Sequence, residues 1–343
     1  MKKISYIICI CLLPQCLWAQ DFVFSQFYES PLLRNPALAG IMQGNLRIVS
    51  AYRSQWSSVT VPYETQALSA EVRLPLNLTG DYLTTSLQLT KDVAGDSKLG
   101  RTQLLPAITF HKALSDAQGE SANYLNFSVM GGLVQSSFDP TKMTFDDQFV
   151  GGSFNPGNIT TAVFSRTSMT YGDLSAGLSF SSNNAGTIKY YAGIAGYHLV
   201  RSKVSFYKND VAILKPRYVL NAGMNMQTGE NDRFYVYGDL NMQGGNRQLM
   251  LGILYKFNIG QYENDDEEIG SKSVSFGASY RWGDALIPVG KIYFSKFFAG
   301  VSYDVNVSKL RSASQFRGGL EVSAGYITNL NILKVPNQIC PGF

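Results

Sequence analysis

The sequence lacks the cysteine and histidine chemistry that many enzymes and metal sites depend on. Three of its four cysteines, Cys9, Cys11 and Cys16, lie near the N-terminus, and only Cys340 follows. A single cysteine excludes an intramolecular disulfide framework and a cysteine-based metal site in the rest of the chain. The histidines, His111 and His198, have no acidic or nucleophilic motif beside them. Because serine-hydrolase, zinc-protease and phosphate-loop patterns are also missing, we expect no enzyme activity, no cofactor and no metal.

The sequence is also poor in charge and in long apolar runs. Charged residues make up 16% of the chain, against about 25% in typical soluble domains. The formal net charge of +4 falls to +2 without Lys2 and Lys3, which is too little to indicate a nucleic-acid partner. After residue 19 no stretch approaches the ~18 apolar residues of a membrane-spanning helix, so a transmembrane helix protein is excluded.

The N-terminus has the pattern of an export signal. Lys2 and Lys3 precede the apolar stretch 4–13, and Ala19 is a small residue suited to cleavage. The stretch is too short to span a bilayer, so residues 1–19 are interpreted as a Sec signal peptide cleaved after Ala19. A lipoprotein signal acylated at Cys16 is the alternative, but Gln15 is a poor fit before such a cysteine.

The sequence does contain stretches in which apolar and polar residues alternate. Aromatic residues make up 13%, glycine counts 32, and mean hydropathy is near neutral at −0.05. In the stretch 82–91, for example, apolar and polar residues alternate with a period of two, which is typical of a β-strand. This composition favours an all-β fold: a transmembrane antiparallel β-barrel of the outer-membrane type with about fourteen strands, 12–16 being compatible. The fourteen predicted strands are 46–54, 64–74, 82–91, 101–112, 122–137, 171–181, 187–199, 216–226, 233–242, 247–258, 272–282, 286–295, 297–308 and 316–328.

A water-soluble all-β protein is the structural alternative. An open sheet of this size would leave strand edges to protect, and a soluble surface would carry more charge. With a periplasmic N-terminus, the short connections 182–186 and 227–232 fall in the periplasm, and the long connection 138–170 falls outside. The acidic connection 261–270 would also be periplasmic, although it is longer than a tight turn.

Several motifs, in order along the chain, carry a family resemblance. The N-terminal motif is DFVFSQFY at 21–28 followed by NPALAG at 35–40. The later motifs are YRSQW at 52–56, ALSA at 67–70, FDPT at 138–141, FDDQ at 145–148, GASYR at 277–281, ALIP at 285–288, GVSYDVNVSKL at 300–310, GGLE at 318–321 and CPGF at 340–343. As a set they resemble the PorP/SprF family. Phe22, where the family often has proline, and Gly342, where a basic residue is common, are departures.

The resemblance implies a type IX secretion system membrane protein from a Bacteroidetes-type bacterium, with a barrel in the outer membrane. In this family some members belong to the core apparatus and others serve one large secreted adhesin, and the sequence leaves both roles open. We therefore expect a non-enzymatic protein, acting in secretion or gliding motility, whose partners are type IX secretion proteins, a large adhesin, or both. The alternative functions are a passive channel for small or hydrophobic solutes and a soluble β adhesin.

The expected organisation is a signal peptide (1–19), an N-terminal periplasmic or plug segment (20–45), a barrel (46–330) and a C-terminal tail (331–343). Partner contacts are expected at the outer rim, in the long outer loop and in the acidic periplasmic loop. Asp139, Asp146 and Asp147 lack the spacing of a calcium-binding loop, so turn formation is the simpler interpretation for them. The full set of candidate contact residues is Tyr52, Arg53, Trp56, Asp139, Phe145, Asp146, Asp147, Asp265, Asp266, Glu267 and Glu268.

Overall fold

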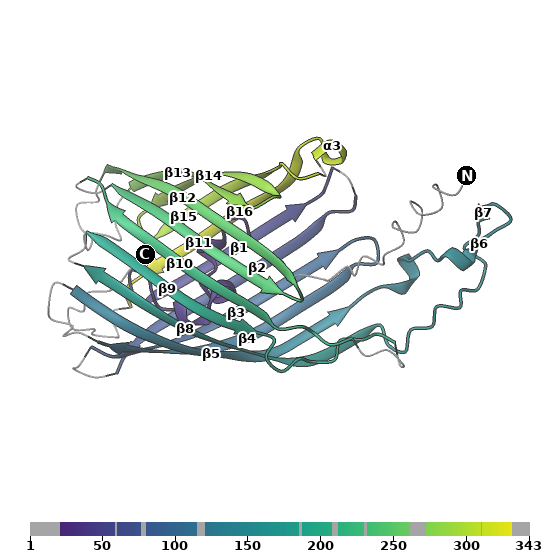
Figure 1. Ribbon diagram of the computed structural model, residues 1–343, viewed down its shortest axis with the longest axis horizontal. Helices are drawn as coiled ribbons and strands as arrows, with labels where there is room; N and C mark the ends of the chain where they lie inside the picture. Colours follow the sequence, from purple (N-terminus) through teal and green to yellow (C-terminus); the bar gives the residue numbers. More distant parts are fainter. Residues whose placement is uncertain are drawn as a thin grey trace, which may run out of the picture.

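Fourteen strands form a closed antiparallel β-barrel, as the alternation predicted (Figure 1). The computed structural model describes residues 21–58, 60–76, 80–114, 121–184, 187–207, 212–229, 232–260, 272–309 and 311–330. Each strand pairs with its neighbour along the chain, and β1 closes the ring against β16. The barrel strands are β1 (Leu46–Gln55), β2 (Tyr63–Pro75), β3 (Tyr82–Ala94), β4 (Leu99–Ala113), β5 (Ser121–Ser137), β8 (Ser168–Asn184), β9 (Ile188–Tyr197), β10 (Arg217–Gln227), β11 (Arg233–Gln243), β12 (Asn246–Gly260), β13 (Lys272–Arg281), β14 (Ala285–Phe294), β15 (Phe297–Asn306) and β16 (Arg317–Thr328).

The barrel wall has an apolar outside and a polar inside because side chains alternate along each strand. Ile108 and Val129 face outward and are 57% and 58% exposed, while their neighbours Thr109 and Ser128 are buried inside. Large exposed apolar side chains recur around the wall on the other strands too. A continuous apolar outer surface is what a lipid bilayer requires, so the alternation places this barrel in a membrane.

Two strands contain a proline, which cannot donate a ladder hydrogen bond. The β4–β5 pairing is interrupted between Leu104↔Leu133 and Ala107↔Met130, at Pro106. The β14–β15 pairing is interrupted in the same way at Pro288. Each proline therefore costs a local gap in one ladder, and the strand continues on both sides of it.

The two ends of the barrel differ. The short-turn end carries the Ser295–Lys296 turn, the start of β1 and the end of β16. The long-loop end carries the connections 138–167 and 198–216 and the short helix α3 (Arg311–Ser314). The strand ends that flank the predicted connections 182–186 and 227–232 lie at the first end, and the predicted connection 138–170 lies at the second. Asp21, which a periplasmic N-terminus would place at the first end, lies at the second. Longer loops face the cell exterior in outer-membrane barrels, so the long-loop end is taken as the outer end.

Regular structure outside the barrel wall is sparse and short. The helical turns are η2 (Phe27–Glu29), α2 (Pro31–Arg34), η3 (Pro36–Leu38), η4 (Pro140–Lys142) and η5 (Asp146–Gln148), and β6 (Phe149–Val150) pairs with β7 (Ser153–Phe154). No helix in the described ranges has the length and hydropathy to cross a bilayer.

Candidate functional site

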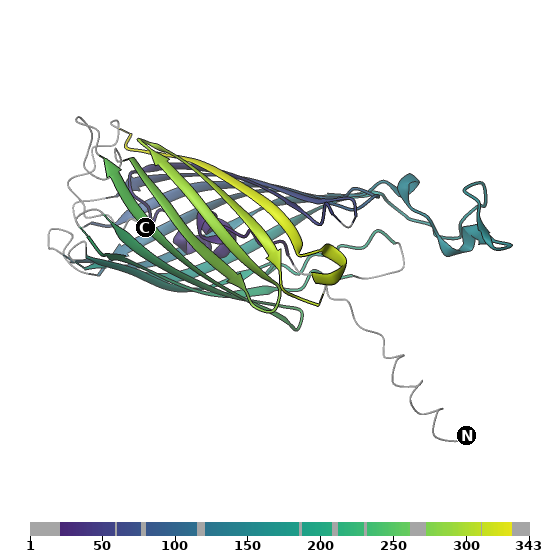
Figure 2. The same cartoon turned by 90° about the horizontal axis from the view of Figure 1, so that it is seen from above.

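Residues 21–45 run through the barrel lumen, and we call them the lumenal segment. Asp21 lies at the long-loop end, where it contacts Arg101 and Gln243, and the Asn45 amide donates to Thr328 at the short-turn end. Nineteen of these 25 residues are buried. The helical turns η2, α2 and η3 are visible inside the wall in both views (Figures 1 and 2). The segment is thus packed into the barrel along the length of the lumen.

Apolar side chains of the segment build a core with the wall. Phe27, Leu38 and Ile41 are buried in one cluster with the wall residues Tyr191, Tyr235, Tyr237, Met250, Leu254 and Ile287. Leu32 and Ala39 are buried in another cluster, whose wall residues include Leu105, Met130 and Val219. Burial of this surface is the main favourable contribution to holding the segment in place.

Asn35, the first residue of the NPALAG motif, joins the segment to two strands. Its Oδ1 accepts the Ala37 amide at 2.9 Å, which caps η3, and its Nδ2 lies 3.2 Å from the carbonyl oxygens of Leu178 and Ile194. The wall also donates to the motif, because Ser179 Oγ bonds the Ala37 carbonyl at 2.9 Å. Asn35 therefore satisfies local and wall groups at once, which explains an asparagine in this buried position.

The glycine that ends the motif has no room for a side chain. Gly40 has φ +80°, and a Cβ there would lie 2.0 Å from Thr84 Oγ1. Its amide donates to Glu71 at 2.9 Å, and Arg47 also donates to this carboxylate. A positive φ and a close contact both require glycine here.

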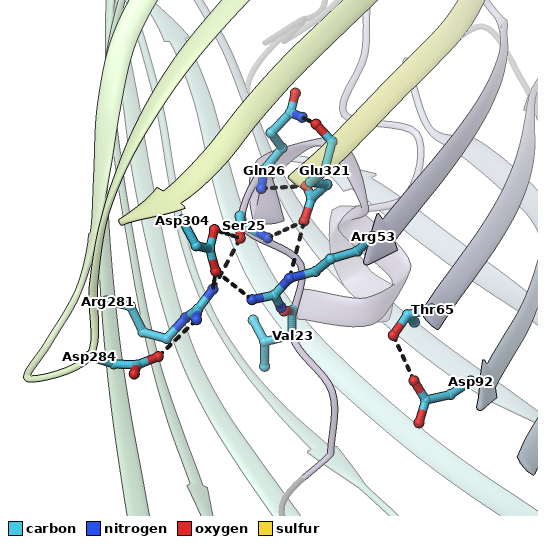
Figure 3. Close-up of polar contacts among 10 residues, drawn as sticks. All are labelled: Val23, Ser25, Gln26, Arg53, Thr65, Asp92, Arg281, Asp284, Asp304 and Glu321. Carbon is cyan, nitrogen blue, oxygen red and sulfur yellow. Dashed lines mark hydrogen bonds and ion pairs between the residues drawn. The ribbon is translucent and has the colours of Figure 1, made fainter. Parts of the chain in front are cut away.

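A buried charge cluster fixes the start of the segment (Figure 3). Glu321 accepts the backbone amides of Ser25 at 2.6 Å and Gln26 at 2.7 Å, and it is 1% exposed. Asp304 accepts Ser25 Oγ at 2.5 Å and the guanidinium groups of Arg53 at 2.7 Å and Arg281 at 2.9 Å. Buried carboxylates are costly unless they are paired and hydrogen-bonded. The segment supplies partners that these two carboxylates need.

A second buried ion pair holds the middle of the segment. Arg34 donates to both oxygens of Asp239, at 2.7 and 2.5 Å, and the side chains are 6% and 3% exposed. The guanidinium carbon also lies 5.0 Å from the Phe27 ring centroid and 5.5 Å from that of Tyr191. The bidentate geometry and the aromatic contacts are those that favour arginine over lysine.

At the long-loop end a histidine joins two carboxylates. His198 Nε2 lies 2.6 Å from Asp21 and its Nδ1 lies 2.7 Å from Asp173. Burial opposes its protonation, but hydrogen bonds to Asp173 and Asp21 prevail and raise the pKa of His198. Burial would raise the pKa of Asp21, yet Arg101 and His198 hold that pKa well below its ordinary value. The first residue of the lumenal segment, Asp21, is therefore fixed at the long-loop end by ion pairs.

The candidate residues of the YRSQW motif point in different directions. The Tyr52 hydroxyl bonds Glu64 at 2.9 Å on the wall, and Trp56 follows β1 at the long-loop end with φ +65°. Arg53 points into the lumen, where it is 4% exposed and bonded to Asp304. The structure thus assigns Arg53 to the internal charge cluster.

The connection 138–167, which we call the arm, extends beyond the barrel at the long-loop end (Figure 2). Within it Asp139 accepts the Thr141 amide at 3.0 Å, and Asp147 accepts the Thr161 amide at 2.6 Å. These hydrogen bonds to Thr141 and Thr161 lower the pKa of each aspartate. Asp146 is exposed and Phe145 is half-buried. The arm aspartates serve as acceptors that shape the loop.

An aromatic cluster supports the base of the arm. Phe138 lies 4.8 Å from Phe164 and 4.7 Å from Phe206 between ring centroids, and Phe164 lies 4.9 Å from Tyr207. These contacts join the arm to the connection 198–216. Other apolar side chains of the arm are exposed: Ile159 94%, Val163 75%, Val150 63% and Phe149 59%.

The remaining candidates, Asp265, Asp266, Glu267 and Glu268, lie outside the described residues, as do the signal peptide and the C-terminal tail. Among the described residues, no group of three His, Cys, Asp or Glu side chains could hold a metal ion. Sequence reasoning missed the lumenal charges Arg34, Asp239, Asp304 and Glu321. The available signal was a charged residue at an inward position of an alternating strand, as at Asp304 and Glu321.

Comparison with protein families gives one match that spans most of the chain. The model described as "Type IX secretion system membrane protein PorP/SprF" matches residues 17–326. A sequence comparison with curated proteins gives no match.

Comparison with solved structures gives other barrels. A Pseudomonas aeruginosa FadL homologue aligns with a TM-score of 0.45 and 8% identity, over 87% of this chain and 94% of that one. The Pseudomonas putida toluene transporter TodX aligns with a TM-score of 0.44 and 10% identity, over 90% and 95%. CdiB from Acinetobacter baumannii aligns with a TM-score of 0.42 and 9% identity, over 82% of this chain and 60% of CdiB.

Proposed function

The chain belongs to the PorP/SprF family of type IX secretion system membrane proteins, as its motifs predicted, and from this premise we propose that it holds a secreted surface protein at the cell exterior. The family and the barrel are those of a secretion protein of the outer membrane. In the proposed role the barrel is a rigid anchor in the lipid, and the arm is the surface that binds the partner. No bond is made or broken.

The exposed apolar arm carries this proposal. Ile159 and Val163 are 94% and 75% exposed on a loop that projects away from the lipid-facing wall. The aromatic cluster at the base of the arm holds the loop against a second connection, so the tip is presented on a supported stalk. Recognition surfaces are commonly loops positioned by a rigid scaffold.

The filled lumen favours an anchor over a passive channel. The lumenal segment buries Leu32, Asn35 and Ala39 completely. Two of the cavities between the segment and the wall have volumes of about 20 Å³, which is room for roughly one water molecule each. A channel for solutes would require this segment to leave, and its buried ion pairs oppose that.

The test is affinity capture of the tagged protein from detergent-solubilised outer membranes, with mass spectrometry of the captured proteins. We expect one large secreted protein, with or without other type IX components, and we expect Ile159→Ser/Val163→Ser to reduce its recovery. Trp282→Ser is the matched control, because Trp282 is 67% exposed on a different connection at the same end. Equal recovery with both variants would exclude the arm. Capture of no secreted protein, with conductance in planar bilayers, would favour the channel function.

A further inference from the structure

Residues 198–207, which follow β9, lie between the lumenal segment and the arm, and we call them the connector. At the start of the connector, His198 lies 2.6 Å from Asp21 of the lumenal segment and 2.7 Å from Asp173 of β8. The end of the connector packs on the aromatic cluster at the base of the arm. One short stretch of chain therefore contacts both the segment that fills the lumen and the loop that carries the proposed binding surface.

Hydrogen bonds join the connector to the arm. The Phe206 carbonyl accepts the Ser165 amide at 3.1 Å and the Ser165 hydroxyl at 2.9 Å. The Ser205 carbonyl accepts Arg166 Nε at 3.0 Å. The Phe206 ring also lies 4.7 Å from the Phe138 ring between centroids. Because these contacts are all at the base of the arm, the position of the arm depends on the position of the connector.

The conformation of the connector depends on its contacts at the lumenal end. His198 and Arg201 have left-handed backbone angles, with φ +57° and +53°. Residues with a Cβ adopt this region at a cost in energy and keep it only where the surrounding structure holds them. His198 is 4% exposed between its two carboxylates, and the Leu199 amide donates to the Leu174 carbonyl at 2.9 Å. Loss of the contact with Asp21 would remove one of these restraints and let the connector relax.

The start of the lumenal segment depends in turn on the connector. The Asp21 carboxylate lies 2.7 Å from Arg101 and 3.6 Å from Arg217, and the Asp21 amide donates to Gln243 at 2.9 Å. These three partners lie on the wall strands β4, β10 and β11. His198 differs from them because it lies in a connection between strands. A movement of the connector would therefore reach the lumenal segment through His198.

We propose that the arm and the lumenal segment stabilise each other through the connector, so that a protein bound to the arm also keeps the lumenal segment in place. The contact with Asp21 keeps the connector ordered, so less conformational entropy is lost when a partner orders the arm. By linkage, a partner that orders the arm strengthens the contact between Asp21 and His198 by the same factor. The identity of the partner rests on the proposed function, whereas the coupling is a property of the isolated chain.

The test is hydrogen exchange of the purified protein in detergent, followed by mass spectrometry. Asp21→Ala removes an acceptor for His198, and the peptide that contains the Ser165 amide should then exchange about fivefold faster or more, since couplings between sites are typically of this size. Asp81→Ala is the matched control, because Asp81 is a buried aspartate that pairs with Lys112 at the opposite end of the barrel. The control should leave exchange of the Ser165 peptide unchanged.

The reverse effect is measured at the lumenal segment. Phe164→Ala removes an arm ring that packs on Tyr207 of the connector, and the peptide 21–28 should then exchange about fivefold faster or more. Phe149→Ala, at a 59% exposed position of the arm, is the control and should leave that peptide unchanged. Absence of either effect, or equal acceleration in peptides of β12, would overturn the coupling. Neither measurement includes a partner, so failure of the coupling would leave the anchoring function to its own test.

Discussion

Replacing Arg34 by methionine tests whether the lumenal segment is locked in the barrel. The substitution keeps much of the side-chain volume but leaves Asp239, whose side chain is 3% exposed, without its bidentate partner. Breaking a buried ion pair from one side costs about 3–5 kcal/mol. A cost of this size shifts the balance between inserted and withdrawn segment by about a hundredfold to several thousandfold.

Two assays measure the consequence of Arg34→Met for stability and for channel opening. The free energy of unfolding, from denaturant titration in detergent, should fall by about 3–5 kcal/mol, and single-channel recordings in planar bilayers should show openings that the unmodified protein lacks. The double variant Arg34→Met/Asp239→Leu removes both charges and should recover most of the stability. Arg311→Met, at an exposed position in α3, is the control and should change stability by less than about 0.5 kcal/mol. A loss below about 1 kcal/mol for Arg34→Met, without openings, would refute the reasoning.

Three further predictions concern other parts of the chain. In Gly40→Ala the new Cβ would sit at a φ of +80° and 2.0 Å from Thr84 Oγ1, so the free energy of unfolding should fall by about 2–4 kcal/mol. Gly95→Ala is the control, because Gly95 has φ +67° but open space around it, and it should lower the free energy of unfolding by only about 1–2 kcal/mol. Equal losses in denaturant titration would contradict the packing argument. The pKa of His198 is higher in the folded protein than in the unfolded chain, so protonated His198 stabilises the fold. This stabilisation is fully present below the unfolded-state pKa of about 6.5, and it is lost as the pH rises through the folded-state pKa. The melting-temperature loss caused by His198→Asn should therefore be largest near pH 6 and shrink toward pH 9, and a loss that grows with pH would reverse the assignment. Asp147→Asn weakens the acceptor for the Thr161 amide, so trypsin should cleave the arm several-fold faster at pH 7.5, whereas unchanged cleavage would show that Asp147 does not shape the arm.

The barrel could be predicted from the sequence because its cause is local. An inward or outward side chain every second residue is visible in any strand, and the predicted stretches 82–91 and 233–242 lie within the observed β3 and within β11. Antiparallel neighbours and an even strand count then follow from the geometry of closure. The small hairpin of β6 and β7 in the arm has only two residues per strand, too few to produce a detectable alternation.

The interior could not be predicted, because its causes are distant in the chain. The Ser25 amide and Glu321 are 296 positions apart, and Arg34 and Asp239 are 205 apart. In one sequence a glutamate such as Glu321 cannot be distinguished from a surface residue, since its burial depends on which segment fills the lumen. Arg53 illustrates this: its motif lies at the rim, but its side chain points inward to Asp304. The exposure of Ile159 could not be predicted either, because it depends on how the arm folds.

Site-specific photo-crosslinking in living cells tests the central claim, a secreted partner held by the arm, most directly. A photoreactive phenylalanine analogue would replace Ile159 at the arm, and Val129, which is 58% exposed on the lipid-facing wall, would be replaced as the control. We expect the arm position to give one discrete adduct with a large secreted protein, and the wall position to give none. Absence of an adduct at Ile159, or the same adduct at both positions, would contradict the proposed anchoring function.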